Sequence, residues 1–184
     1  MKGLVSVRLS HSQKNTLASA ARLYAQQIHL AQDYLVARGL SLEAAKRAGL
    51  GVVSEPIIGH EHVINRLSIP YITPTGVVDI RFRSLHDETP KYMGLAGAKT
   101  HMYNVRAIME ASDDIAICEG ELDAVTLHYA IGVPAVAIPG ATNWKSHYRR
   151  MLQDFERVYI FGDGDKAGHD FARTLAGEVQ GSIV

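Results

Sequence analysis

The sequence predicts an α/β fold, in which a parallel sheet covered by helices follows a small α+β subdomain. Three observations support this prediction. The first fifty residues carry apolar side chains at helical spacing, and the next stretch, up to about residue 105, is broken by prolines and glycines into short β-like runs. After residue 111 short apolar runs alternate with helical segments, the pattern of a parallel sheet covered on both faces. We divide the chain into domains of residues 1–108 and 109–184.

Three helices are expected in the amino-terminal region. The first is predicted over residues 12–28 and a second, shorter one over about 30–37. The third begins after Ser41, which can cap its amino terminus, and ends near Gly49, a residue that suits the left-handed conformation at helix ends.

The middle region is expected to form an antiparallel sheet. Its predicted strands cover residues 67–73, 77–85 and 91–95, with a Pro-Thr-Gly turn between the first two. His60 and His62 alternate along an extended stretch before them, but no further ligands are spaced for zinc. We therefore expect both histidines to be exposed to solvent.

The carboxyl-terminal region is expected to alternate strands and helices. Strands are predicted at 115–118, 134–138, 158–162 and 182–184, and helices at 122–131, 144–153 and 167–179. In sheets of this kind functional loops lie at the carboxyl ends of the strands. Candidate site residues are therefore sought just after each strand.

Length and composition exclude several classes of protein. With 184 residues and 47% hydrophobic content the chain can form a core, so disordered and fibrous classes are excluded. The single cysteine, Cys118, allows no disulfide framework, zinc ribbon or iron–sulfur cluster and fits a reducing cytosol. No secretory signal is recognisable, and no apolar run approaches the roughly 20 residues of a membrane helix. We expect a cytoplasmic protein without membrane association.

The charge of the chain is polarised although its net charge is zero. Residues 1–105 carry 12 Lys and Arg against 7 Asp and Glu, whereas residues 106–184 carry 7 against 12. This division suggests that the first part holds a polyanion and the second part a metal ion. Ordinary variation of surface charge would give the same counts.

Carboxylates stand where the predicted sheet should carry a site. Glu119 follows the strand at 115–118, Asp163 and Asp165 follow the strand at 158–162, and Asp123 falls in the first turn of the next helix. Two charges about 4 Å apart repel by roughly 4 kcal/mol at an effective dielectric constant of 20, so such a cluster needs a cation or a proton. Oxygen ligands suit Mg²⁺ or Mn²⁺. We predict such an ion at Glu119, Asp163 and Asp165, although a single acid of this kind more often caps a helix.

Together, these motifs resemble a known domain. The segment CEGELDAV after one strand, the Pro139-Gly140 pair, and FGDGDKAG after another strand resemble the TOPRIM domain of DnaG-type primases, type IA and II topoisomerases and certain nucleases. The resemblance covers about residues 112–184. It implies that Asp163 and Asp165 are metal ligands and that Glu119 is an acid/base or metal-associated group.

The upstream half resembles DnaG-type bacterial and phage primases. The resemblance is carried by YLVARGLSLEAAKRAGLG and by IPYITPTGVVDIRFRSL followed by PKY. It implies that Arg83, Lys91 and Tyr92, with Arg81 beside them, face template and incoming nucleotide. A further family lysine has an approximate counterpart in Lys99. Without the resemblance, the two arginines would be expected on the solvent face of a strand.

The resemblance implies a DNA primase core that makes short RNA primers from ribonucleoside triphosphates on single-stranded DNA, by nucleotidyl transfer that depends on a divalent metal. Asp163 and Asp165 would hold the metal, Glu119 and Asp123 would assist, and Lys91 with Arg83 would grip phosphates. Primases of this type usually carry a zinc-binding module and a helicase or helicase-binding part, which we expect as separate partners or on a removed part of the protein.

Two alternatives to a primase stay open. A TOPRIM nuclease would use similar metal chemistry with water as the nucleophile. A DNA-binding or assembly module of a replication complex would keep the fold without catalysis. Primer synthesis compared with strand degradation distinguishes these possibilities.

Overall fold

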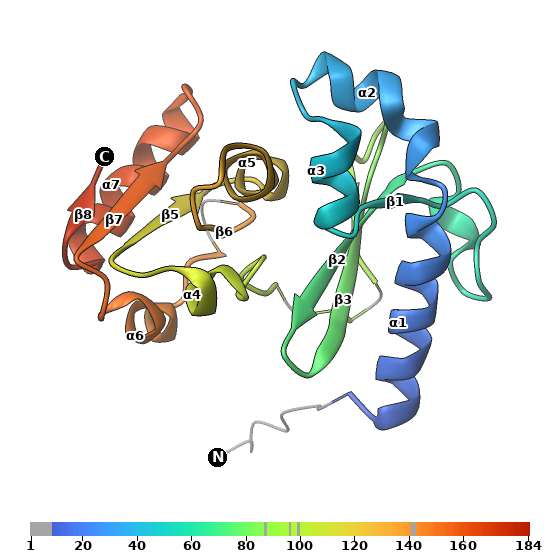
Figure 1. Cartoon of the computed structure of the whole chain (residues 1–184), viewed down its shortest axis with the longest axis horizontal. Helices are drawn as coiled ribbons and strands as arrows, with labels where there is room; N and C mark the ends of the chain where they lie inside the picture. Colours follow the sequence, from blue (N-terminus) through green and yellow to red (C-terminus); the bar gives the residue numbers. More distant parts are fainter. Residues whose placement is uncertain (1–8, 87, 96, 99, 141–142) are drawn as a thin grey trace.

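The computed structural model describes residues 9–86, 88–95, 97–98, 100–140 and 143–184. Two four-stranded sheets stand side by side in it, one with the strand order β1-β2-β3-β4 and the other β6-β5-β7-β8 (Figure 1). The first sheet is antiparallel and the second is parallel. The expected α/β fold, with a parallel sheet after an α+β region, is confirmed. No helix within the described residues is long and apolar enough to span a membrane.

The amino-terminal helices are shorter than the sequence pattern predicts. Helix α1 (His11–Ala25) ends three residues early, and the chain tightens into the 3-10 turn η1 (Ile28–Ala31) before α2 (Gln32–Ala37). The apolar residues at helical spacing belong to two different core clusters, because Leu17 packs with residues of β3 whereas Ile28 belongs to the cluster that joins the two sheets.

Helix α3 (Leu42–Arg47) has the ends that the sequence predicts. The backbone N–H of Ala44 donates to Ser41 Oγ at 3.1 Å, and Gly49 has a φ of +72°. These two residues fix where the helix begins and ends.

The antiparallel sheet follows the prediction in its long strands. It comprises β1 (Gly51–Val52), β2 (Leu67–Thr73), β3 (Gly76–Arg83) and β4 (Tyr92–Met93). Strand β1 was not predicted, because two residues are too few to show an alternation. Helix α1 packs across one face of this sheet, and α5 with the parallel sheet lies on its other side (Figure 1).

The prediction that His60 is exposed to solvent is wrong. His60 is buried, with its Nδ1 at 2.8 Å from the Tyr24 hydroxyl and its ring edge against Phe82 at 5.3 Å between centroids. The expected extended stretch is instead the 3-10 turn η2 (Glu61–Val63), which leaves His62 exposed while His60 turns inward. Burial lowers the pKa of His60.

The parallel sheet contains β5 (Asp114–Cys118), β6 (Ala135–Ala137), β7 (Arg157–Phe161) and β8 (Ser182–Ile183). Helix α7 (Lys166–Glu178) packs on one face and α5 (Glu121–Val125) on the other. The predicted helix at 122–131 is present, but its second half is the π-helical segment η3 (Thr126–Ile131).

The predicted helix over residues 144–153 is present in part. The 3-10 turn η5 (Ser146–Tyr148) leads directly into the short helix α6 (Arg149–Leu152), and residues 144 and 145 lie outside both. Trp144 and Lys145 are held by partners far along the chain, since they donate to Glu178 and to the carbonyl of Thr100. A further short helix, α4 (Ala107–Glu110), was not predicted.

One apolar core joins the two sheets. It combines residues of the amino-terminal helices and β2 with residues of β5 and α5, among them Leu35, Leu40, Ile69, Cys118, Leu122 and Val125. Apolar burial of this kind is the main force that holds packed elements together. It fixes the ends of β3 and β4 beside the start of α5. The proposed boundary between residues 108 and 109 stays a prediction.

Candidate metal and nucleic-acid site

Carboxylates gather at the carboxyl ends of β5 and β7, which are neighbours in the sheet. Glu119 directly follows β5, and Asp163 follows β7 by two residues. The Asp163 N–H donates to Glu119 Oε2 at 3.3 Å, and the Glu119 N–H donates to the Phe161 carbonyl at 3.2 Å. We call this place the acid end and define it as Glu119, Asp123, Asp163 and Asp165.

Two glycines bring the loop after β7 against the first turn of α7. A Cβ at Gly168 would lie 2.1 Å from the carbonyl oxygen of Asp163, and one at Gly162 would lie 2.3 Å from the carbonyl oxygen of Gly168. Asp165 caps this helix, because its Oδ1 accepts from the Gly168 N–H at 2.8 Å. Its carboxylate therefore has a structural partner as well as a place beside Asp163.

The acidic residues influence one another electrostatically. Partial burial raises the pKa of Glu119, and the charges of Asp163, Asp165 and Asp123 raise it further. The pKa of Asp123 is also raised, first by desolvation and then by Asp163, while Arg38 and Arg83 oppose the rise. The predicted neighbourhood of these four carboxylates is therefore present.

The carboxylates do not form a closed metal site. No group of three or more His, Cys, Asp or Glu within the described ranges is arranged to hold an ion. All available donors are carboxylate oxygens, which is the chemistry that Mg²⁺ and Mn²⁺ prefer, and Mg²⁺ commonly takes its other ligands from water and phosphates. The donor set thus fits such an ion, and the ligand role of Glu119, Asp163 and Asp165 stays a prediction.

Arginines and tyrosines alternate in a stack beside the acid end. The Arg83 guanidinium lies 4.9 Å from the ring centroid of Tyr92 and 5.8 Å from that of Tyr34, and Arg38 lies 5.0 Å from the Tyr34 ring. Arg83 also donates to the Tyr92 hydroxyl. We call Arg38, Tyr34, Arg83 and Tyr92 the basic ladder. Because Arg38 and Arg83 both favour the ionised form of Asp123, the ladder adjoins the acid end.

The predicted binding residues differ in their exposure to solvent and in the contacts they make. Lys91 is exposed at the edge of the ladder. Arg83 is buried in the ladder, and its Nε has no hydrogen-bond partner among the residues that the structure describes. Tyr92 is half-buried between Arg81 and Arg83. Lys99 lies outside the described residues.

Arg81 is engaged in an ion pair with a buried carboxylate. Its Nη1 lies 2.6 Å from Glu121 Oε1, and the Tyr71 hydroxyl donates to the same oxygen at 2.8 Å. Glu121 is 1% exposed and the Arg81 side chain 24%. Burial and the charge of Glu121 raise the pKa of Tyr71, so its hydroxyl stays a donor. This ion pair joins β3 to α5, and the predicted contact of Arg81 with nucleic acid stays a prediction.

Sequence reasoning missed four residues of this region: Tyr34, Arg38, Tyr71 and Glu121. Tyr34 and Arg38 stand four residues apart in one helical segment, a spacing that brings side chains together and could have been noticed. Nothing in the sequence marks Glu121 as buried, because a glutamate in the first turn of a helix is usually a solvated residue at the positive end of the helix dipole.

Comparison with known proteins identifies the family. Residues 116–183 match a family model described as Toprim-like. The Gene 57 protein of Mycobacterium phage D29 is 42% identical over 115 residues, which cover 60% of this chain and 75% of that protein. The chain belongs to this Toprim-like family. The DNA primase of Neisseria meningitidis serogroup A is 26% identical over 191 residues, covering 83% of this Toprim-like chain and 32% of the primase.

Solved structures share the fold of this Toprim-like protein. The RNA polymerase domain of Mycobacterium tuberculosis primase DnaG gives a TM-score of 0.71 at 23% identity, covering 94% of this chain and 74% of that one. A DnaG primase catalytic domain bound to ssDNA gives 0.70 at 21% identity, with 92% and 68% covered. The predicted resemblance to the TOPRIM and primase folds is confirmed, and the chain spans about a third of the length of the curated primase it matches.

Proposed function

We propose that this chain is a DNA primase core, which joins ribonucleoside triphosphates into short RNA primers on single-stranded DNA. One observation carries the proposal: the acid end lies beside the basic ladder where the two sheets meet. This proximity is evident from the charges of Arg38 and Arg83, which act on the pKa of Asp123. The primases among the relatives and the ssDNA-bound structure of similar fold support it.

The basic ladder is suited to bind phosphates before any chemistry occurs. An arginine fork can engage phosphate oxygens in two hydrogen bonds at once, and stacking on aromatic rings holds its plane. Arg83 is held in this way between Tyr34 and Tyr92, which fixes its orientation. Arg38 and Lys91 are exposed on either side and would take phosphates of the template or of the triphosphate.

The acid end would hold Mg²⁺ or Mn²⁺ through Glu119, Asp163 and Asp165. When bound, such an ion neutralises charge on the reacting phosphate oxygens. Glu119 Oε2 is oriented by the Asp163 N–H, and Asp165 is oriented by its capping bond to Gly168, so two of these carboxylates have fixed positions before an ion arrives. Asp123 is the member of the acid end on which Arg38 and Arg83 of the ladder act, and it would link the two.

The partners follow from the same proposal. Template and ribonucleoside triphosphates would lie across the junction, and a replicative helicase and a zinc-binding module are the further partners that we propose. We expect low synthesis by this chain alone and an increase when a zinc-containing partner is added.

The proposal is tested by supplying labelled ribonucleoside triphosphates, single-stranded template and Mn²⁺ to the wild type and to Asp163→Asn. We expect dinucleotides and short primers from the wild type and none from the variant. A labelled DNA strand in a parallel reaction should stay intact. Degradation of that strand in place of synthesis would identify a nuclease, and inactivity in both reactions, with DNA binding retained, would identify a non-catalytic module.

A further inference from the structure

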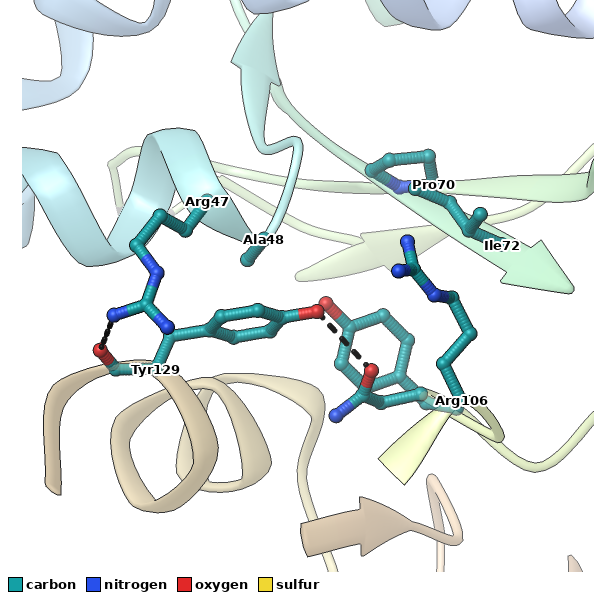
Figure 2. A pocket seen from close by; sticks show the side chains of 8 residues that line it. Arg47, Ala48, Pro70, Ile72, Arg106 and Tyr129 are labelled. Carbon is teal, nitrogen blue, oxygen red and sulfur yellow. Dashed lines mark hydrogen bonds between the residues drawn. The ribbon is translucent and has the colours of Figure 1, made fainter. Parts of the chain in front are cut away.

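The two sheets meet at a second place, which the proposed primase function does not use. A pocket there is lined by Arg47 and Ala48 at the end of α3, Pro70 and Ile72 on β2, and Tyr103, Asn104, Arg106 and Tyr129 from the second half of the chain (Figure 2). None of these residues belongs to the acid end or to the basic ladder. Both halves of the molecule therefore contribute to its wall.

The floor of the pocket is fixed by hydrogen bonds. Asn104 is buried with a φ of +55°, a conformation that asparagine adopts more readily than most residues. Its Nδ2 donates to the carbonyl of Ala135 at 2.8 Å, and its Oδ1 accepts from the Tyr129 hydroxyl at 3.2 Å. The Tyr103 ring packs edge-on against Tyr71. The polar groups of the Asn104 side chain are therefore hydrogen-bonded, and these contacts fix the shape of the pocket.

Two guanidinium groups flank this floor, and little negative charge lies near them to neutralise them. Arg47 Nη1 donates to the carbonyl of Tyr129 at 3.2 Å, and none of the ion pairs between described residues includes Arg47 (Figure 2). Arg106, half exposed, lies 3.7 Å from Glu110. Glu110 also faces His128 Nε2 at 3.0 Å, so one carboxylate serves two neighbours. No carboxylate lines the pocket itself.

A histidine lies close enough to both arginines for their charges to act on it. Burial lowers the pKa of His128 most, the Glu110 carboxylate raises it, and Arg47 and Arg106 lower it by smaller amounts. Among the described residues, no group forms a hydrogen bond with the buried Nδ1 atom of His128. His128 is therefore an electrostatic neighbour of both arginines, and its resonances can serve as a probe for an anion bound between them.

The size of the pocket limits what can enter. Its enclosed part has a volume of about 20 Å³, enough for roughly one water-sized group, and the rest opens to solvent. A base or sugar does not fit, but the terminal oxygens of an anionic group do. Guanidinium forks match phosphate oxygens in geometry and charge. We propose that the pocket binds one phosphate group of a nucleotide or of a nucleic acid strand, held between Arg47 and Arg106.

Pyrophosphate is the probe for this site, titrated at pH 7.5 into metal-free buffer at constant ionic strength. The readout is the imidazole C–H resonance of His128 in NMR spectra. We expect a saturable shift in the wild type, and an affinity lower by roughly tenfold in Arg106→Ala, which removes one charged hydrogen bond. Arg47→Ala should have a similar effect, with part of the affinity kept in Arg47→Lys.

Two controls separate this pocket from other basic surfaces. Arg150→Ala removes an exposed arginine of α6, and Lys91→Ala removes a charge from the edge of the basic ladder. Both should leave the His128 shift unchanged. Because Arg47 also holds α3 to η3, Arg106→Ala, whose side chain is half exposed, decides the test. Unchanged affinity in Arg106→Ala, or no saturable shift at His128, would overturn the proposal.

Competition then identifies the source of the phosphate. ATP displacing pyrophosphate more strongly than an unphosphorylated dT oligonucleotide assigns the pocket to nucleotides, and the reverse result assigns it to a strand. Displacement by neither would overturn the proposal. Primer synthesis is not part of the readout, so failure here leaves the proposed function untouched.

Discussion

The two sides of the candidate site are built in opposite ways. In the basic ladder each charged group is stacked, hydrogen-bonded or buried, as Arg83 is between Tyr34 and Tyr92. At the acid end Asp163 and Asp165 are exposed, and partial burial together with neighbouring carboxylates raises the pKa of Glu119. Packing thus orders the side that we propose to bind phosphate, whereas the acidic side keeps mutual repulsion that a cation would relieve.

The largest effect is expected from Asp165→Asn. Asparagine is as good a helix cap as aspartate, so the bond to the Gly168 N–H and the stability of α7 should be kept. The loss of a negative ligand should lower primer synthesis by about 100-fold or more, since a bound ion contributes several kcal/mol to the transition state. Synthesis and thermal unfolding measured together check this prediction. Full activity would show that the acid end has no catalytic role.

The next largest effect is expected at the ion pair between Arg81 on β3 and Glu121 on α5. Arg81→Met leaves Glu121 buried without its charged partner, and breaking a buried pair costs about 3 to 5 kcal/mol. We expect the free energy of unfolding, measured with denaturant, to fall toward the lower end of that range because Arg81 keeps partial exposure.

The double variant Arg81→Met, Glu121→Gln isolates the charge from the packing. It removes both charges and leaves an oxygen for the Tyr71 hydroxyl, so most of the lost stability should return. Arg157→Ala is the matched control, since its pair with Asp114 lies on the surface and should matter little. If the double variant is no more stable than Arg81→Met, an unpaired Glu121 charge is not the cause of the loss.

The sequence predicted the acidic side of the site better than the basic side. Strand ends and i, i+2 spacing suffice to place Glu119, Asp163 and Asp165 at one sheet edge, because a parallel sheet has a regular geometry. The role of Arg81 depends on a carboxylate forty residues away, on another element. Such a contact follows from how the two sheets pack, which local patterns do not encode.

A smaller effect is expected when Lys91 is replaced by alanine. Lys91 is exposed, so no packing is lost and stability should be unchanged. If it contacts a phosphate of single-stranded DNA, the slope of log K against log salt should decrease by roughly 0.7. Binding measured at several salt concentrations gives this slope. An unchanged slope would remove Lys91 from the binding face.

The smallest effect concerns pH and lies away from the site. The pKa of His60 is lowered in the folded protein, so the unfolded chain binds more protons below its ordinary pKa of about 6.5. His60 therefore lowers stability as the pH falls from about 6.5 through its folded pKa. We expect the melting temperature of His60→Gln to depend less on pH between 7.5 and 5.5 than that of the wild type. His62→Gln, at an exposed position, should behave as the wild type does.

The fold was easier to predict where the signals in the sequence are local. Strand β2 and the capped helix α3 were predicted well because alternation and capping are local signals. The bend after α1 and the broken segment around Trp144 were not, because distant partners decide them. His60 shows the same limit, since its burial depends on Tyr24 and Phe82.

The contact between Gly168 and Asp163 also has a consequence for motion. Because the helix backbone lies directly against the loop, the loop has no room to settle unless the first turn of α7 is already wound. When that turn frays, the Asp163 carboxylate is displaced with it. We therefore expect the amide hydrogens of both segments to exchange with solvent through the same local opening. The part of the acid end that carries Asp163 and Asp165 is thereby assembled together with the beginning of a helix, so binding of the proposed ion would be tied to a local order–disorder equilibrium.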